Sequence, residues 1–221
     1  MYFKDYIISG HSSVVERLVA NEKVEGSTPF ARSIKKVIKS NFLTSIFQSY
    51  IEKKDIRKLK NNFLYYLFFR IIRIFLSYDL IIKIYGFKVY GSIKKNKTSH
   101  FLLKKCEFGD YHELNTIKKF SKKKKLLFVD CGCNYGFYAL YTAALAKENK
   151  IVAIDASKKT LGEFIKNINL NNFKNINFFN YAVSNKNGEN ISFKESINDW
   201  ESSQAHDNFE FFSETNVKTI T

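Results

Sequence analysis

Residues 126–140 read LLFVDCGCNYGFYAL and indicate the class of fold. The apolar run Leu126–Val129 ends in Asp130, and a glycine-containing turn follows it. From Phe137 to Lys147 the sequence is rich in small apolar residues, which predicts a closely packing helix. The stretch therefore predicts a strand, a loop and a helix in succession.

The residues that follow repeat this pattern. Lys150–Ile154 is a second apolar run that ends in Asp155, Thr160–Leu170 has the apolar spacing of a helix, and Ile176–Tyr181 is a third predicted strand. The order βαβαβ requires parallel strands and right-handed crossovers. We therefore predict an α/β fold with a partial doubly wound sheet.

In such a sheet, ligands bind beyond the carboxyl ends of the strands. Gly132 and Gly136 allow a tight turn there, and the helix that follows offers free N–H groups to an anionic group. Asp155 lies 23 residues after Gly132, near the spacing at which an acid binds ribose hydroxyls. We expect an adenosine-containing ligand.

The loop also distinguishes between two such ligands. Dinucleotide enzymes use G-x-G-x-x-G, whereas this loop has G-x-x-x-G with the carboxylate of Asp130 directly before it. An anionic group suits a positively charged ligand, and S-adenosylmethionine carries an ammonium and a sulfonium. The loop favours the methyl donor, and a nicotinamide-dependent enzyme is the alternative.

Several segments together resemble the motifs of the FkbM-type methyltransferases. The resemblance covers about residue 100 to the end of the chain. It is carried by VDCGCNYGFYAL (129–140), AIDAS (153–157), residues 167–171, NYAVSNKNGE (180–189) and VKTIT (217–221). The last segment is similar to the strand that follows a hairpin in that family.

The resemblance implies a class I S-adenosylmethionine fold and O-methylation of a hydroxyl on a small-molecule or carbohydrate acceptor, such as a sugar or a secondary metabolite. It also implies the cofactor-binding residues. These are Asp130, Gly132, Asn134 and Gly136 at the methionine end, Asp155 at the ribose, and Asn180 to Ala182 beside the adenine.

The chain departs from the family pattern in three places. Cys131-Gly132-Cys133 stands where the family usually has Ile-Gly-Ala, and Asp155-Ala156 where it has Glu-Pro. The sequence also ends before the family's Lys-Ile-Asp-x-Glu-Gly strand. We therefore expect a truncated gene or a partial sequence, and the activity of this chain is left open. No catalytic residue is assigned. A hydroxyl acceptor needs a general base, for which the candidates are His112, Glu113 and His206.

Gly10–Ser33 fits neither a helical nor a strand period. It resembles a translated transfer-RNA gene, because Ser12–Arg17 can be coded by a D-arm sequence and Gly26–Pro29 by a T-arm sequence. We accordingly expect a non-native leader in residues 1–33, a basic and aromatic helical region in 34–85, and the methyltransferase domain in 86–221, incomplete at its C-terminus.

Two helices are predicted in the helical region. The first spans about 43–51, and the second, 62–76, is apolar almost all round. Packing against the catalytic domain or a second subunit is the favoured interpretation, and peripheral membrane contact through 43–82 is the alternative. A non-catalytic membrane-surface module is thus a third functional hypothesis. Residues 87–92 and 100–106 are predicted as strands joined by a turn at 94–97, and 110–120 as a helix.

The amino-acid composition excludes several other classes of protein. The 221 residues include 36 Lys and Arg against 21 Asp and Glu, a net charge of +15. Lys outnumbers Arg 31 to 5, a ratio typical of AT-rich codon usage. Codon bias therefore accounts for the positive charge, and we expect no nucleic-acid partner. A composition 45% hydrophobic excludes a disordered chain. The three cysteines suit neither a disulfide framework nor a metal site. With no predicted transmembrane segment or secretory signal, a cytoplasmic location is expected.

Overall fold

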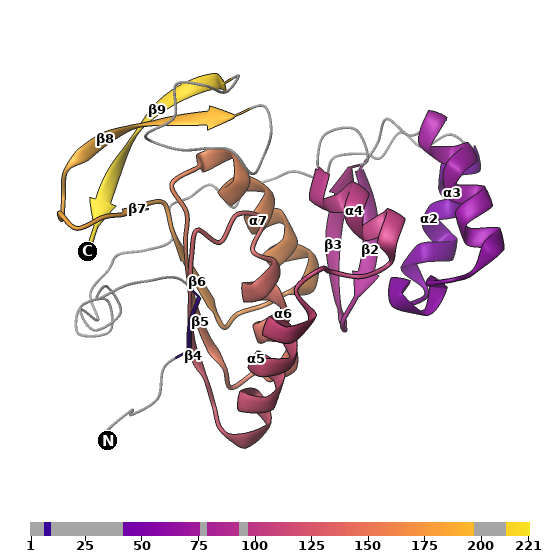
Figure 1. The fold of residues 1–221 in the computed structure, drawn as a ribbon, viewed down its shortest axis with the longest axis horizontal. Coiled ribbons are helices and arrows are strands. Elements are labelled where there is room, and N and C mark those ends of the chain that lie inside the picture. Colours follow the sequence, from indigo (N-terminus) through magenta and orange to yellow (C-terminus); the bar gives the residue numbers. More distant parts are fainter. Residues whose placement is uncertain (1–6, 10–41, 76–78, 93–96, 197–210) are drawn as a thin grey trace. The chain divides into compact units, whose positions relative to one another are not determined.

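The computed structural model describes residues 7–9, 42–75, 79–92, 97–196 and 211–221 (Figure 1). The chain divides into two compact units. The first comprises residues 1–31 with 113–221, and the second comprises residues 32–112. The domain boundary expected at residue 86 therefore lies inside the second unit.

The first unit is an α/β structure built on the predicted repeat. Its elements are β4 (Leu127–Cys131), α6 (Phe137–Leu145), β5 (Lys150–Ile154), α7 (Lys158–Asn171) and β6 (Ile176–Phe179). The three strands are parallel and adjacent in the order β4-β5-β6. Both crossovers run in the same direction, and Figure 1 shows α6 and α7 on one side of the strands. The predicted parallel βαβαβ arrangement is confirmed at this level.

A short strand, β1 (Ile7–Ser9), pairs in parallel with β4 on the side opposite β5. These three residues fall within the segment that the sequence assigned to a leader. Residues 10–33, which carry the resemblance to a transfer-RNA gene, lie outside the described residues.

A second sheet follows β6. It contains β7 (Ala182–Val183), β8 (Asn190–Ser196) and β9 (Phe211–Ile220) in the order β7-β9-β8. β9 is antiparallel to β8 and parallel to β7. Val217 and Thr219 of β9 are buried, and Ile220 packs against Val129 and Ile154 of the parallel sheet. The last strand thus covers part of the core rather than extending the parallel sheet.

Helix α5 (Tyr111–Lys123) precedes β4 and lies on the same side as α6 in Figure 1. It buries Leu114 and Ile117, three residues apart, and ends in a run of lysines that interact favourably with the helix dipole. Phe128 and Ala153 of the sheet are almost fully buried, as is Phe164 of α7. These residues belong to the apolar core of the first unit.

The second unit combines helices with one hairpin. Its elements are α2 (Phe42–Glu52), η2 (Ile56–Leu59), α3 (Phe63–Phe75), β2 (Asp79–Ile84), β3 (Phe87–Ser92) and α4 (Lys97–Lys105). Its core contains Phe47, Ile51, Tyr65 and Ile82, all with 0% exposure. Both helices predicted in this region are present within one residue of their expected ends.

The prediction of a strand at 100–106 is wrong, because these residues belong to α4 and the turn that follows it. Leu102, Leu103 and Cys106 are buried together, which is the one-sided spacing of a helix. The partner of β3 is instead β2. Tyr85 and Gly86 connect them with φ of 50° and 89°, the two positive values of a type I′ turn. The turn expected at 94–97 lies outside the described residues except for Lys97, which begins α4.

Among the described residues, no helix has both the length and the apolar character that spanning a bilayer requires.

Candidate functional site

The glycine loop after β4 folds back on the end of β5. The backbone N–H groups of Gly132 and Cys133 both donate to the carbonyl of Ile154, at 2.8 and 3.0 Å. Gly132, Asn134 and Gly136 have φ of 74°, 51° and 74°. Three of the five residues 132–136 are therefore left-handed, which makes the loop a tight turn. Gly136 is the N-cap of α6.

Asp155 ties this loop to the next one. Its Oδ2 accepts from the backbone N–H of Asn134 at 2.6 Å, and its Oδ1 accepts from the N–H of Ser157 at 2.8 Å and the hydroxyl of Thr160 at 3.2 Å. The residue is 9% exposed. Burial raises the pKa of this carboxyl above its ordinary value of 3.8, although the hydrogen bonds from Ser157, Asn134 and Thr160 oppose the rise.

Asp130 lies in β4, directly before the loop in the sequence. It is 3% exposed, and its Oδ2 accepts from the backbone N–H of Ala139 at 3.2 Å in the first turn of α6. Burial raises the pKa of the Cys133 thiol well above its ordinary value, and the charges of Asp130 and Asp155 raise it further. Two carboxylates therefore act on one loop residue, and Cys133 stays a protonated thiol rather than a nucleophile.

The residues expected beside the adenine divide into two environments. The side-chain amide of Asn180 donates to the carbonyls of Asp155 and Ala156 at 2.9 and 2.8 Å, which joins the end of β6 to the loop after β5. Ala182 is buried in β7, where it is paired with Thr219. Asn180 thus lies at the same sheet edge as Asp155, whereas Ala182 belongs to the second sheet.

A buried polar network at the start of α7 was missed by sequence reasoning. Ser157 caps this helix, and its hydroxyl donates to Glu195 Oε1 at 2.6 Å. Glu195 is 4% exposed and also accepts from the hydroxyl of Ser213 at 3.1 Å. Ser157 directly before the helical period was a recognisable capping signal. Glu195 had no local signal, because 38 residues separate it from Ser157.

The arrangement fits the ribose of a nucleoside in two respects. A carboxylate has about four lone-pair positions, and three of those on Asp155 are used within the chain, so Oδ2 keeps the capacity to accept one hydroxyl. Gly132 is exposed, and a Cβ added to it would meet no atom within 4 Å. The loop therefore leaves space beside its backbone at Gly132.

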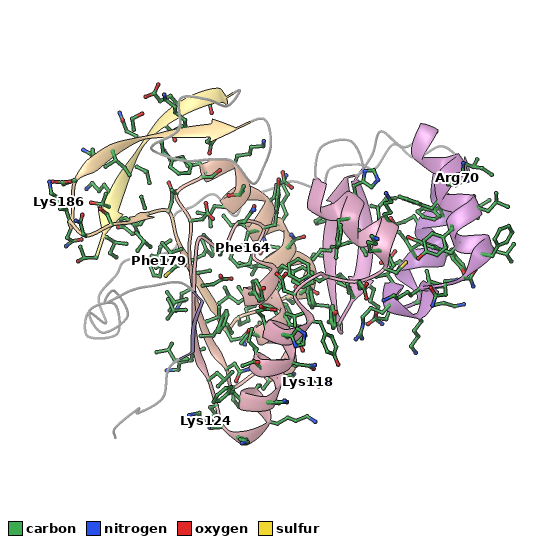
Figure 2. All side chains as sticks on the ribbon, in the orientation of Figure 1. Arg70, Lys118, Lys124, Phe164, Phe179 and Lys186 are labelled. Carbon is green, nitrogen blue, oxygen red and sulfur yellow. The ribbon has the colours of Figure 1, made fainter. Side chains whose placement is uncertain are left out.

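The other glycine of the loop has the opposite surroundings. A Cβ on Gly136 would lie 2.0 Å from two carbons of the Phe164 ring, so the loop packs directly against α7. Figure 2 labels Phe164 on α7 and Phe179 at the end of β6. Gly136 thus has a packing role at the base of the loop, and Gly132 is the glycine that borders open space.

Comparison of the chain with protein-family models, with curated proteins and with solved structures gives no match. The site consists of two buried carboxylates, a loop with left-handed residues between them in the sequence, and the N-terminus of a helix.

The structure does not identify the general base among the three candidates. His112 and Glu113 are exposed in the first turn of α5, and His206 lies outside the described residues. Among the described side chains, no group of three or more His, Cys, Asp or Glu could hold a metal ion. The general base stays unassigned.

Proposed function

We propose that residues 113–221 form the cofactor-binding part of an S-adenosylmethionine-dependent methyltransferase with a Rossmann-like class I fold, of the FkbM type. The observation that carries this proposal is the pair Asp130 and Asp155. Asp130 lies in β4, one residue before its end, Asp155 directly follows the adjacent parallel strand β5, and both carboxylates act on the same loop. Both charges raise the pKa of the Cys133 thiol, so this edge of the sheet carries negative charge.

This charge pattern favours a cationic nucleoside over a dinucleotide. Residues 126–146 contain no Lys or Arg, so the loop itself offers a pyrophosphate only backbone N–H groups. Asp130 already accepts from the first turn of α6, which partly neutralises the helix end that would otherwise attract an anion. The ammonium and sulfonium of S-adenosylmethionine suit this environment better than a nicotinamide dinucleotide does.

Each residue of the site has a defined part in the proposal. Asp155 accepts a ribose hydroxyl with the remaining capacity of Oδ2, and the open space beside Gly132 admits the ligand to the loop backbone. Asn180 is a positioning residue, since its amide holds the backbone that carries Asp155. Asp130 supplies negative charge toward the methionine end.

When bound, S-adenosylmethionine supplies an activated methyl group with a neutral thioether as the leaving group. What the protein contributes is orientation, which can supply much of the acceleration of a displacement reaction. The Asn134–Asp155 hydrogen bond fixes the loop before the ligand arrives. An acceptor hydroxyl on a sugar or secondary metabolite must still lose its proton to a base, and that group is unassigned.

Calorimetric titration of the full chain tests the proposal. S-adenosylhomocysteine should bind saturably, and NADH should not. Asp155→Ala should weaken the binding of S-adenosylhomocysteine at least tenfold, whereas Glu189→Ala, an exposed carboxylate on another loop, should leave the affinity unchanged. Saturable NADH binding without binding of S-adenosylhomocysteine would replace the proposal by a nicotinamide-dependent enzyme.

A further inference from the structure

Helix α3 has two apolar faces, and only one of them is used inside the second unit. Tyr65 and Phe69 are buried with their rings stacked, and the Tyr65 hydroxyl donates to the carbonyl of Leu103 at 2.5 Å. On the other face, large apolar side chains are exposed: Phe63 by 76%, Leu64 by 70%, and Leu67 and Ile71 by 46% each.

The exposed residues form a single stripe. At about 100° per residue, positions 63, 64, 67 and 71 fall within an arc of about 100°, and the buried positions 65 and 69 lie on the far side. A surface helix normally presents polar residues to water, and contiguous apolar patches mark interaction sites. We call these four residues the α3 stripe.

Positive charge surrounds the α3 stripe in the sequence. Residues 56–78 contain no Asp or Glu but five cations, namely Arg57, Lys58, Lys60, Arg70 and Arg73. Residues 32–112 contain 18 Lys and Arg against five Asp and Glu, so this unit carries +13 of the net +15. The charge excess and the exposed apolar helix therefore belong to the same unit.

Exposed basic residues lie on α3 and shortly before it in the sequence. Arg70 is three positions after Leu67 and borders the stripe on the helix surface, and Figure 2 shows it on the outer part of α3. Lys58 is exposed just before the helix begins. Lys60 is also exposed and is ion-paired with Glu107. Long basic side chains beside an apolar stripe can reach headgroups while the stripe enters the acyl region.

We propose that the α3 stripe docks on an anionic lipid surface. A second copy of the chain is a less suitable occupant. A two-fold contact would bring Arg70 of one copy close to Arg70 of the other, and the two second units, each with a net charge of +13, would repel one another. A nucleic acid would be bound by basic side chains at its phosphates rather than by an aliphatic stripe. This inference is independent of the proposed methyltransferase activity.

Flotation of the full chain with vesicles tests this. The chain should bind vesicles of phosphatidylcholine with 30% phosphatidylglycerol, and it should bind pure phosphatidylcholine vesicles at least tenfold more weakly. Leu64→Ser combined with Leu67→Ser should reduce binding at least tenfold, and Arg70→Glu several-fold. Phe120→Ser, at an exposed apolar position of α5, is the matched control and should bind as the unmodified chain does.

Circular dichroism should show that the variants keep their folded signal, since the replaced side chains are exposed. The proposal is overturned if the full chain does not float with anionic vesicles, or if the stripe variants float as well as the control does. It is equally overturned if the chain is a dimer that the stripe substitutions dissociate and that ignores vesicles, because the stripe would then be an interface between copies.

Discussion

The backbone N–H of Asn134 donates to the Asp155 carboxylate at 2.6 Å, across 21 residues of sequence. Asn134 stands in a left-handed conformation, with φ of 51°, in the loop after β4, and Asp155 follows β5. One hydrogen bond therefore couples the turns at the ends of two adjacent parallel strands. The carboxylate that we propose as the ribose ligand is also the group that fixes the shape of the loop.

The open space beside Gly132 predicts a selective loss of ligand binding. Gly132→Asn keeps a residue type that tolerates positive φ, as Asn61, Asn134 and Asn172 do in this chain, but it adds a side chain beside the loop. Binding of S-adenosylhomocysteine should fall at least tenfold by calorimetry. Gly188→Asn is the control, since Gly188 has φ of 77° and equally open surroundings. Equal affinities of the two variants would argue against a ligand at Gly132.

The packing of Gly136 predicts a loss of stability. Gly136→Ala places a methyl group on the Phe164 ring and forces an alanine to a φ of 74°. Overpacking costs about 1–3 kcal/mol, and the left-handed conformation adds about 1 kcal/mol. Urea unfolding should show a loss of about 3 kcal/mol. A loss below about 1 kcal/mol would mean that the loop and α7 are not in close contact.

Gly162 within α7 gives the opposite expectation. A Cβ at this position meets no atom within 4 Å, and the residue does not have a positive φ. Gly162→Ala should therefore stabilise the first unit by about 0.5–1 kcal/mol, because alanine loses less conformational freedom in a helix. Thermal unfolding measures the change, and a lowered melting temperature would contradict the helical assignment.

The buried cap of α7 predicts a second destabilising variant. Ser157→Ala removes the acceptor for the Thr160 N–H and a donor to Glu195, which is 4% exposed. Loss of an N-cap and of a buried partner together should cost about 2 kcal/mol in urea unfolding. Ser192→Ala on β8 is the comparison, since its serine is exposed and its cost should stay below about 0.5 kcal/mol. Equal losses in the two variants would contradict a buried network.

The raised pKa of Asp155 predicts a pH dependence. The ionised carboxylate accepts a ribose hydroxyl, so affinity for S-adenosylhomocysteine should fall as the pH is lowered through this raised pKa, above the ordinary value of 3.8. The folding stability depends on pH in the opposite direction from the ligand affinity. A raised carboxyl pKa stabilises the fold at acid pH, and that contribution is lost as the pH rises from 3.8 through the raised value. Calorimetry from about pH 7 to pH 4 should show this fall in affinity. An affinity that stays constant would mean that Asp155 does not contact the ligand.

Sequence reasoning predicted the parallel strands and their helices because their signals are local. Apolar runs that end in Asp130 and Asp155, with glycines between them, need no knowledge of distant residues. The α4 helix was missed because Leu102 and Leu103 in a short lysine-rich segment also suit a strand. The turn at Tyr85 was missed because tyrosine is an unusual residue at positive φ.

The candidate site was predicted in the same uneven way. The residues after β4 and β5 follow from the topology, and Asp155 and Asn134 do meet. Glu195 could not be predicted, since β8 brings it to Ser157 from 38 residues away. The exposed side of α3 could not be predicted either, because the sequence of a helix that is apolar all round does not show which of its faces is buried.

A crystal structure of the full chain with S-adenosylhomocysteine would show directly whether Asp155 and the glycine loop bind the cofactor. A ribose hydroxyl should lie within hydrogen-bond distance of Asp155 Oδ2, with the ligand beside Gly132 and its amino group on the side of Asp130. A ligand bound at another edge of the sheet, or an Asp155 carboxylate turned away from it, would contradict this placement of the cofactor.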